Sequence, residues 1–114
     1  PQDTLEQRAV LWTQALVRVP SVSGSPACLQ VLETARDLIE STGVEADIRI
    51  LFLKRPTGAA GPNRPRQTGV PELMLSGHVD VVPPAGMEDS LGARIEGDRM
   101  HGRGTTDMKS GAAC

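Results

Sequence analysis

The stretch Leu73-Met74-Leu75-Ser76-Gly77-His78-Val79-Asp80 decides the fold class. Its first three residues form a short apolar run of the kind that lies buried in the middle of a sheet, and His78 and Asp80 follow where such a strand would end. Helical patterns precede this run, and a hairpin pattern follows it. Because helices and strands occur in one mixed order, the sequence predicts an α/β fold with helices layered on a sheet.

Two amphipathic helices are predicted before the apolar run. Thr4 and Gln7 fit a capping box, and apolar residues then recur at helical spacing over residues 5 to 18. Ser25-Pro26 has the pattern of a cap followed by a first-turn proline, so it predicts the start of a second helix. The apolar stripe of this helix consists of Cys28, Val31, Leu32, Ala35, Leu38 and Ile39.

The hydrophobic period changes to two after the second helix. Apolar and charged residues alternate from Val44 to Phe52, which predicts a strand with one face in water. Residues 54 to 71 are rich in glycine and proline and predict a surface loop. Residues 93 to 96 and 99 to 101 flank Gly97-Asp98 and predict a hairpin in which Ile95 lies opposite Met100.

Composition limits the class of protein. A chain of 114 residues makes about one small domain. Its net charge of -2, from 12 basic and 14 acidic residues, creates no field that would recruit nucleic acid or an anionic membrane. The first residues lack the features of a signal peptide, and no apolar run approaches the roughly 18 residues of a membrane span. Because the two cysteines form no CxxC motif, we expect a soluble cytoplasmic protein.

His78 and Asp80 have the spacing of a metal ligand and the residue that orients it. Side chains two residues apart on a strand leave the same face about 6 to 7 Å apart at the backbone. A histidine that binds a metal through one ring nitrogen is usually oriented by an acceptor on the other, and Asp80 can supply that acceptor. The alternative is a buried histidine beside a capping aspartate, which a bare His-x-Asp pattern favours.

Residues 102 to 111, Gly-Arg-Gly-Thr-Thr-Asp-Met-Lys-Ser-Gly, form a glycine loop that runs into a helical pattern. Asp107 lies at the expected helix start, where backbone N–H groups stabilise a carboxylate, so an N-cap role is the alternative to a ligand role. A P-loop is excluded because Met108 and Arg103 stand where it needs glycines. A dinucleotide-binding loop is excluded because Asp107 replaces its third small residue and would repel the pyrophosphate.

The segments 75–83 and 102–111 together resemble the signature of the zinc aminoacylase and peptidase family that contains acetylornithine deacetylase, succinyl-diaminopimelate desuccinylase, aminoacylase and glutamate carboxypeptidase. The two motifs lie in the family's order and at about its separation. The resemblance implies the start of a three-layer αβα catalytic domain with a mixed sheet. Residues 1–114 would be the amino-terminal part of that zinc-binding domain.

By resemblance, His78 is a terminal ligand to one zinc, Asp107 bridges two zincs, and Asp80, the expected catalytic residue, holds the His78 ring. The full-length enzyme is then expected to use two zinc ions, with cobalt as an alternative, to activate the water that cleaves the amide bond of an N-acyl amino acid or short peptide. The family's paired glutamates, its other ligands and its lid domain, through which full-length copies could form a homodimer, would lie beyond residue 114. We therefore expect this chain to be an inactive amino-terminal fragment.

A second class of function competes with the hydrolase. The chain could be a short, non-catalytic binding or interaction module that retains only the beginning of the fold. A stop codon directly after residue 114 would support the module, whereas an in-frame Glu-Glu pair followed by a distant histidine would support the hydrolase. Three further residues are not predicted as ligands, because His101 suits a surface or packing role, Cys28 belongs to a helical stripe and Cys114 has no partner in view.

Overall fold

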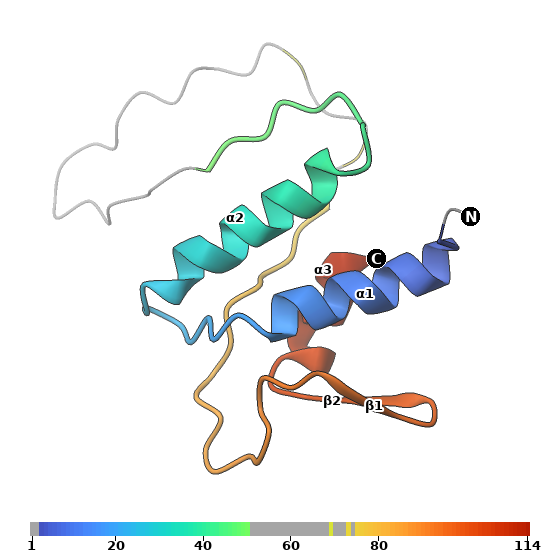
Figure 1. The fold of residues 1–114 in the computed structure, drawn as a ribbon. Coiled ribbons are helices and arrows are strands. Elements are labelled where there is room, and N and C mark those ends of the chain that lie inside the picture. Colours follow the sequence, from blue (N-terminus) through green and yellow to red (C-terminus); the bar gives the residue numbers. More distant parts are fainter. Residues whose placement is uncertain (1–2, 51–68, 70–72, 74) are drawn as a thin grey trace, which may run out of the picture.

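The computed structural model describes residues 3–50, 69, 73 and 75–114. Its elements follow the order α1 (Leu5–Val17), α2 (Ala27–Glu40), β1 (Arg94–Glu96), β2 (Arg99–His101), the π-helical turn η1 (Thr105–Lys109) and α3 (Ser110–Ala113) (Figure 1). Helix α1 contacts α2, η1 and α3, so it lies at the centre of the described elements. No helix among these residues is long and apolar enough to cross a membrane.

Helix α1 begins as the capping box predicts. The Thr4 hydroxyl oxygen accepts the Gln7 backbone N–H at 3.2 Å, and the Gln7 side-chain oxygen accepts the Thr4 backbone N–H at 2.9 Å. Two of the N–H groups that a helix start leaves without partners are thereby satisfied. The helix ends at Val17, one residue before the predicted end.

Helix α2 starts differently from the prediction. Pro26 already has helical backbone angles (φ -58°, ψ -26°) and is itself the N-cap, with no side-chain hydrogen bond to cap the helix. The predicted Ser25 cap is therefore wrong: its hydroxyl is buried without a partner in the described residues, while its carbonyl accepts the Cys28 N–H at 3.1 Å. At the other end, Gly43 takes a positive φ of 73°, which ends the helix without strain.

The core lies between the two long helices and the last turn of the chain. Helix α2 contributes Val31, which is fully buried, whereas Leu32 and Ile39 of the same predicted stripe stay 41% and 39% exposed. The stripe therefore faces the core along only part of its width. The buried cluster consists of Leu16, Val19, Val31 and Ala113, with Trp12, Ala27, Ala35, Leu38 and Val79 packed against it.

The predicted strand over residues 44–52 is wrong where the structure describes it. Residues 44–50 form no strand, and burial alternates only at the end of this segment, where Ile48 and Ile50 are half-buried and Arg49 is exposed, while Val44 and Ala46 are exposed. A strand also needs a neighbour to accept its backbone hydrogen bonds, and none of the described residues pairs with this segment. Of the predicted loop at 54–71, only Gly69 is among the described residues.

The prediction that Leu73-Met74-Leu75 lies buried in a sheet is also wrong for the residues described. Leu73 is 75% exposed and Leu75 is 86% exposed, because no described strand lies beside them. Pairing begins farther along the chain, where Val22 and Val81 form an isolated parallel bridge. In Figure 1 the segment that follows Leu75, drawn in yellow to orange, runs past α2 and α1 toward the hairpin.

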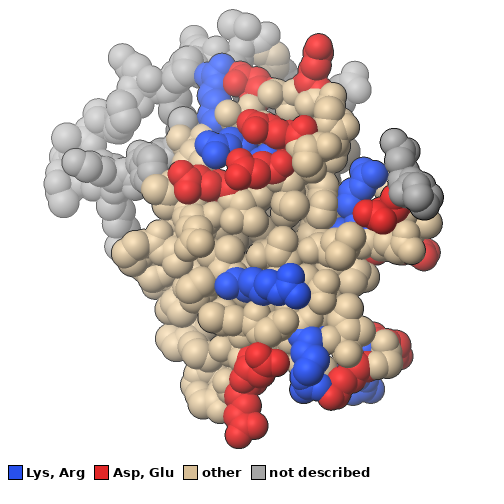
Figure 2. Space-filling view, in the orientation of Figure 1, with Lys and Arg blue, Asp and Glu red and all other residues tan. Residues whose placement is uncertain are grey.

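The predicted hairpin is confirmed with its register. Strands β1 and β2 pair antiparallel, with Ile95 opposite Met100 and Glu96 opposite Arg99, around the turn at Gly97. The described residues thus contain helices and a two-stranded antiparallel sheet, which agrees with an α/β fold in its coarse sense. Figure 2 shows basic and acidic side chains interspersed over the visible face rather than gathered into one field of one sign.

Two glycines let the loop after β2 approach the rest of the molecule closely. A Cβ at Gly102 would lie 2.7 Å from Cγ1 of Val17, and a Cβ at Gly104 would lie 2.6 Å from Cγ1 of Val81. Gly104 also has a φ of 90°, which side chains other than glycine rarely adopt. Only glycine at both positions allows the loop to pack against α1 and against Val81.

We predict that Gly104→Ala lowers the free energy of unfolding of the full-length protein by about 2 to 5 kcal/mol, because it adds a left-handed backbone penalty to a steric clash. Gly43→Ala is the matched control: Gly43 also has a positive φ, but a Cβ there meets nothing within 4 Å. It should cost only about 1 to 2 kcal/mol. Urea titration of both variants measures the difference, and equal losses would contradict the predicted clash.

Candidate metal-binding site

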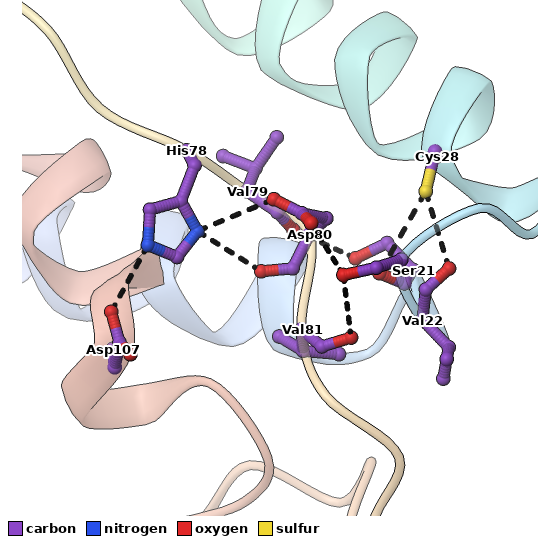
Figure 3. Close-up of polar contacts among 9 residues, drawn as sticks. Ser21, Val22, Cys28, His78, Val79, Asp80, Val81 and Asp107 are labelled. Atoms are coloured by element: carbon purple, nitrogen blue, oxygen red, sulfur yellow. Dashed lines mark hydrogen bonds and ion pairs between the residues drawn. The ribbon is translucent and has the colours of Figure 1, made fainter.

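The residues singled out in the sequence line one open cavity of about 330 Å³. Its wall includes His78 and Asp80 from the segment after the apolar run, Asp107 from η1, and Ser23 from the connection between α1 and α2. The three segments that carry these residues are far apart in the sequence, and the fold brings them together. Figure 3 shows His78, Asp80 and Asp107 in this arrangement. The cavity is therefore the place where the predicted site residues meet.

His78 has a carboxylate on each side of its ring. Its Nε2 lies 3.0 Å from Oδ1 of Asp107, and its Nδ1 lies 3.3 Å from Oδ1 of Asp80 and 3.2 Å from the Asp80 carbonyl oxygen. Figure 3 shows the ring between these two partners. The expected contact between His78 and Asp80 is present, and Asp107 comes to the other nitrogen across 29 residues of sequence.

Ser23 is a site residue that the sequence analysis did not identify. Its hydroxyl donates to Oδ2 of Asp80 at 2.5 Å and also lies 3.3 Å from the Val81 carbonyl oxygen. Its side chain can reach Asp80 because residues 21–23 run parallel to residues 79–81. The Val81 N–H donates to the Ser21 carbonyl at 2.9 Å, and the Ser23 N–H donates to the Val81 carbonyl at 2.9 Å. A serine in a short linker gives no local signal of this pairing.

Asp107 is held by the backbone of the glycine loop rather than by a helix start. The N-cap of α3 is Lys109, and α3 has no side-chain capping hydrogen bond, so the alternative of an Asp107 N-cap does not hold. Asp107 itself has extended backbone angles (φ -125°, ψ 99°), and the peptide bond that follows it is cis. Its side chain is 85% exposed on the cavity side and contacts the His78 ring.

The two carboxylates and the serine shift the pKa values of the site. The pKa of His78 is raised above 6.5, first by the hydrogen bond to the Asp80 carbonyl and then by the carboxylates of Asp107 and Asp80, which favour the charged ring. The pKa of Asp80 is lowered, chiefly because the Ser23 hydroxyl donates to the ionised carboxylate. Both carboxylates therefore stabilise a proton on the His78 ring.

The remaining candidates lie outside this cavity or lack partners. His101 lies 3.4 Å from Glu96 across the hairpin, which agrees with the predicted surface role. The Cys28 thiol is half-buried at the start of α2 and lies 3.3 Å from the Val22 carbonyl oxygen, outside the buried core cluster that its helical stripe predicts it to join. Cys114 is exposed and forms no disulfide.

The donor atoms around His78 are of the kinds that bind zinc, but there are too few of them for a complete zinc site. An imidazole nitrogen and a carboxylate oxygen are ordinary zinc donors, and a second carboxylate on the far ring nitrogen is the usual support for a ligating histidine. A zinc ion normally takes three or four protein ligands. Among residues 3–50, 69, 73 and 75–114, no group of three or more His, Cys, Asp or Glu side chains could hold a metal ion. The described residues therefore do not by themselves form a complete metal site.

Comparisons with known proteins support the family resemblance. Residues 74–114 match the family described as Peptidase family M20/M25/M40. The chain is 38% identical over 107 residues to the succinyl-diaminopimelate desuccinylase of Methylobacterium nodulans, an alignment that covers 90% of this chain and 26% of the relative. It is 38% identical over 118 residues to that of Rhodopseudomonas palustris, covering 97% of this chain and 29% of the relative. No solved structure matches the chain.

These matches confirm the resemblance drawn from the two motifs. Both motifs lie within residues 74–114, which match Peptidase family M20/M25/M40, and the similarity to the two desuccinylases extends over most of the chain. The chain spans between a quarter and a third of the length of these two curated relatives.

We predict that the His78 ring in the metal-free full-length protein titrates above 6.5, the value of a free histidine. Because the folded pKa exceeds the unfolded one, the stabilisation from the ion pairs is fully present below about pH 6.5 and is lost as the pH rises through the folded pKa. NMR titration of the ring measures this value. Asp107→Asn should lower the pKa of His78, and a wild-type pKa at or below 6.5 would contradict the predicted contacts.

Proposed function

We propose that this chain is the amino-terminal part of a zinc-dependent hydrolase that cleaves the amide bond of N-acyl amino acids or short peptides. The observation that carries the proposal is the arrangement of the His78 ring, with Asp107 on Nε2 and Asp80 on Nδ1. The family match and the relatives named succinyl-diaminopimelate desuccinylase support this substrate class.

In this proposal each residue of the site has a separate role. His78 and Asp107 would hold zinc, with Asp107 as the carboxylate shared by two ions, and Asp80 would fix the tautomer and orientation of the His78 ring. Ser23 holds the Asp80 carboxylate in turn. When bound, zinc supplies Lewis acidity toward the substrate carbonyl and lowers the pKa of water, and cobalt could replace it.

The proposal extends to the parts of the enzyme outside this chain. We infer that residues 1–114 begin a three-layer αβα domain with a mixed sheet, and that the general base, the remaining ligands and a lid domain belong to other parts of a longer protein. A homodimer through that lid domain is the proposed assembly, with a small N-acyl amino acid or peptide as substrate. A reducing, cytoplasmic location suits the two free cysteines.

We predict that Asp107→Ala in the full-length enzyme removes nearly all bound zinc and nearly all activity, because a bridging carboxylate serves both ions. Zinc per chain, from mass spectrometry of the native protein, measures the loss. Asp80→Asn is the matched comparison, since it alters the other contact of the same ring. It should retain most of the zinc but lower affinity or rate by about 10- to 100-fold. Two zincs per chain and normal turnover in Asp107→Ala would refute the ligand role.

A second experiment separates the hydrolase from a non-catalytic module. Expressed alone, residues 1–114 should show no zinc-dependent amidase activity, because His78 and Asp107 supply too few ligands for even one zinc. They should also associate, because Leu73 and Leu75 remain exposed. Size-exclusion chromatography and hydrolysis of acetylated amino acids, with and without zinc, measure both properties. A monodisperse, inactive protein would favour the module, and an active one would refute the proposed division of the site.

A further inference from the structure

Lys109 is a fully buried cation that none of the proposed roles uses. Its side chain has 0% exposure, and its Nζ donates to the carbonyl oxygens of Leu16 at 2.8 Å and Val19 at 2.9 Å. Lysine is almost never fully buried unless its charge is paired or hydrogen-bonded. Here the partners are the carbonyl groups of Leu16, in the last turn of α1, and of Val19, two residues after the helix. These carbonyls also accept the backbone N–H groups of Val19 and Ser21, and the helix dipole favours a positive charge near this end.

The same residue belongs to the loop that carries Asp107. Lys109 lies two residues after Asp107, and its backbone N–H donates to the Gly104 carbonyl at 2.9 Å. The aliphatic part of its side chain passes close to Gly104, since a Cβ there would lie 3.1 Å from Cδ of Lys109. Lys109 therefore closes the loop through its backbone hydrogen bond to Gly104, and it attaches the loop to the end of α1 through the hydrogen bonds of its ammonium group.

We infer that Lys109 is a positioning residue for the metal site: its two hydrogen bonds to the end of α1 hold the glycine loop where Asp107 meets His78. The inference rests on the proposed role of Asp107 as a metal ligand. The Asp107 side chain is 85% exposed and makes a contact with His78 but no other side-chain hydrogen bond among the described residues. Its position is consequently set by the backbone, and the nearest buried attachment of that backbone is Lys109.

The test compares three variants of the full-length enzyme. Lys109→Met keeps a side chain of similar length but removes both hydrogen bonds. Lys109→Gln fits the same space and keeps an amide N–H donor. It provides a second variant, so the test still works if Lys109→Met fails to fold. Val17→Ala is the matched control, because Val17 is also fully buried at the end of α1 and packs against Gly102 without any hydrogen bond to the loop. If Lys109 contributes only to the stability of the fold, Lys109→Met and Val17→Ala should have similar effects.

The first readout is the affinity for added zinc, measured by titration of the metal-free enzymes well below their melting temperatures. Lys109→Met should bind zinc about 10- to 100-fold more weakly than the unaltered enzyme, because changes to the residues that support a metal ligand have effects of this size. Lys109→Gln should be intermediate, and the zinc affinity of Val17→Ala should stay within a few-fold of that of the unaltered enzyme. For turnover, the same order should appear in kcat, with KM changed little because Lys109 is buried away from the substrate.

The second readout needs no metal. In the metal-free enzyme, the NMR signal of the His78 ring nitrogen that faces Asp107 should lose its hydrogen-bonded shift in Lys109→Met and retain it in Val17→Ala. If the Met variant keeps this signal and binds zinc as Val17→Ala does, the inference is overturned. Failure of the proposed function has a different signature: the unaltered enzyme would bind no zinc, while the ring signal would still report whether Lys109 positions Asp107.

Discussion

The parallel pairing of residues 21–23 with residues 79–81 is the constraint on which the described structure depends. Two backbone hydrogen bonds through Val81 attach the connection between α1 and α2 to the segment that follows His78. A third bond, from the Ser21 hydroxyl to the Val79 carbonyl at 2.8 Å, is made by a side chain with no exposure. Because buried polar groups are costly unless they are bonded, this pairing fixes the register of the two segments and thereby places Ser23 against Asp80.

Local features could be predicted from the sequence, and features that need a distant partner could not. The Thr4 capping box and the hairpin around Gly97 depend on residues a few positions apart, so their patterns were sufficient. The alternation from Val44 onward and the apolar run at Leu73 have strand patterns, but a strand exists only beside another strand, and the described residues provide none there. The error at Ser25 has a different cause: the helix begins at Ala27, one residue later than the cap pattern predicts, and Pro26 takes the N-cap position in place of Ser25.

The candidate site shows the same division between features that the local sequence predicts and features that depend on distant residues. The spacing of His78 and Asp80 and the family resemblance, which implies the role of Asp107, point to these residues, and the structure brings the His78 and Asp107 side chains to 3.0 Å. Neither the contact of Ser23 with Asp80 nor the burial of Lys109 has a signal in the local sequence, because both side chains bond to groups more than 50 residues away. A motif names the residues that carry the chemistry, whereas the residues that support them are selected by the tertiary contacts of one particular fold.

The bond between Lys109 and the end of α1 has a consequence for the motions of the protein. Helix ends are the first places where a folded chain opens, and each opening exposes the backbone groups that it releases. At this helix end, the carbonyl groups of Leu16 and Val19 cannot be freed without also freeing the ammonium group of Lys109. We therefore expect fraying of α1 and displacement of the loop that carries Asp107 to be coupled, so that the backbone amides of the two segments open together.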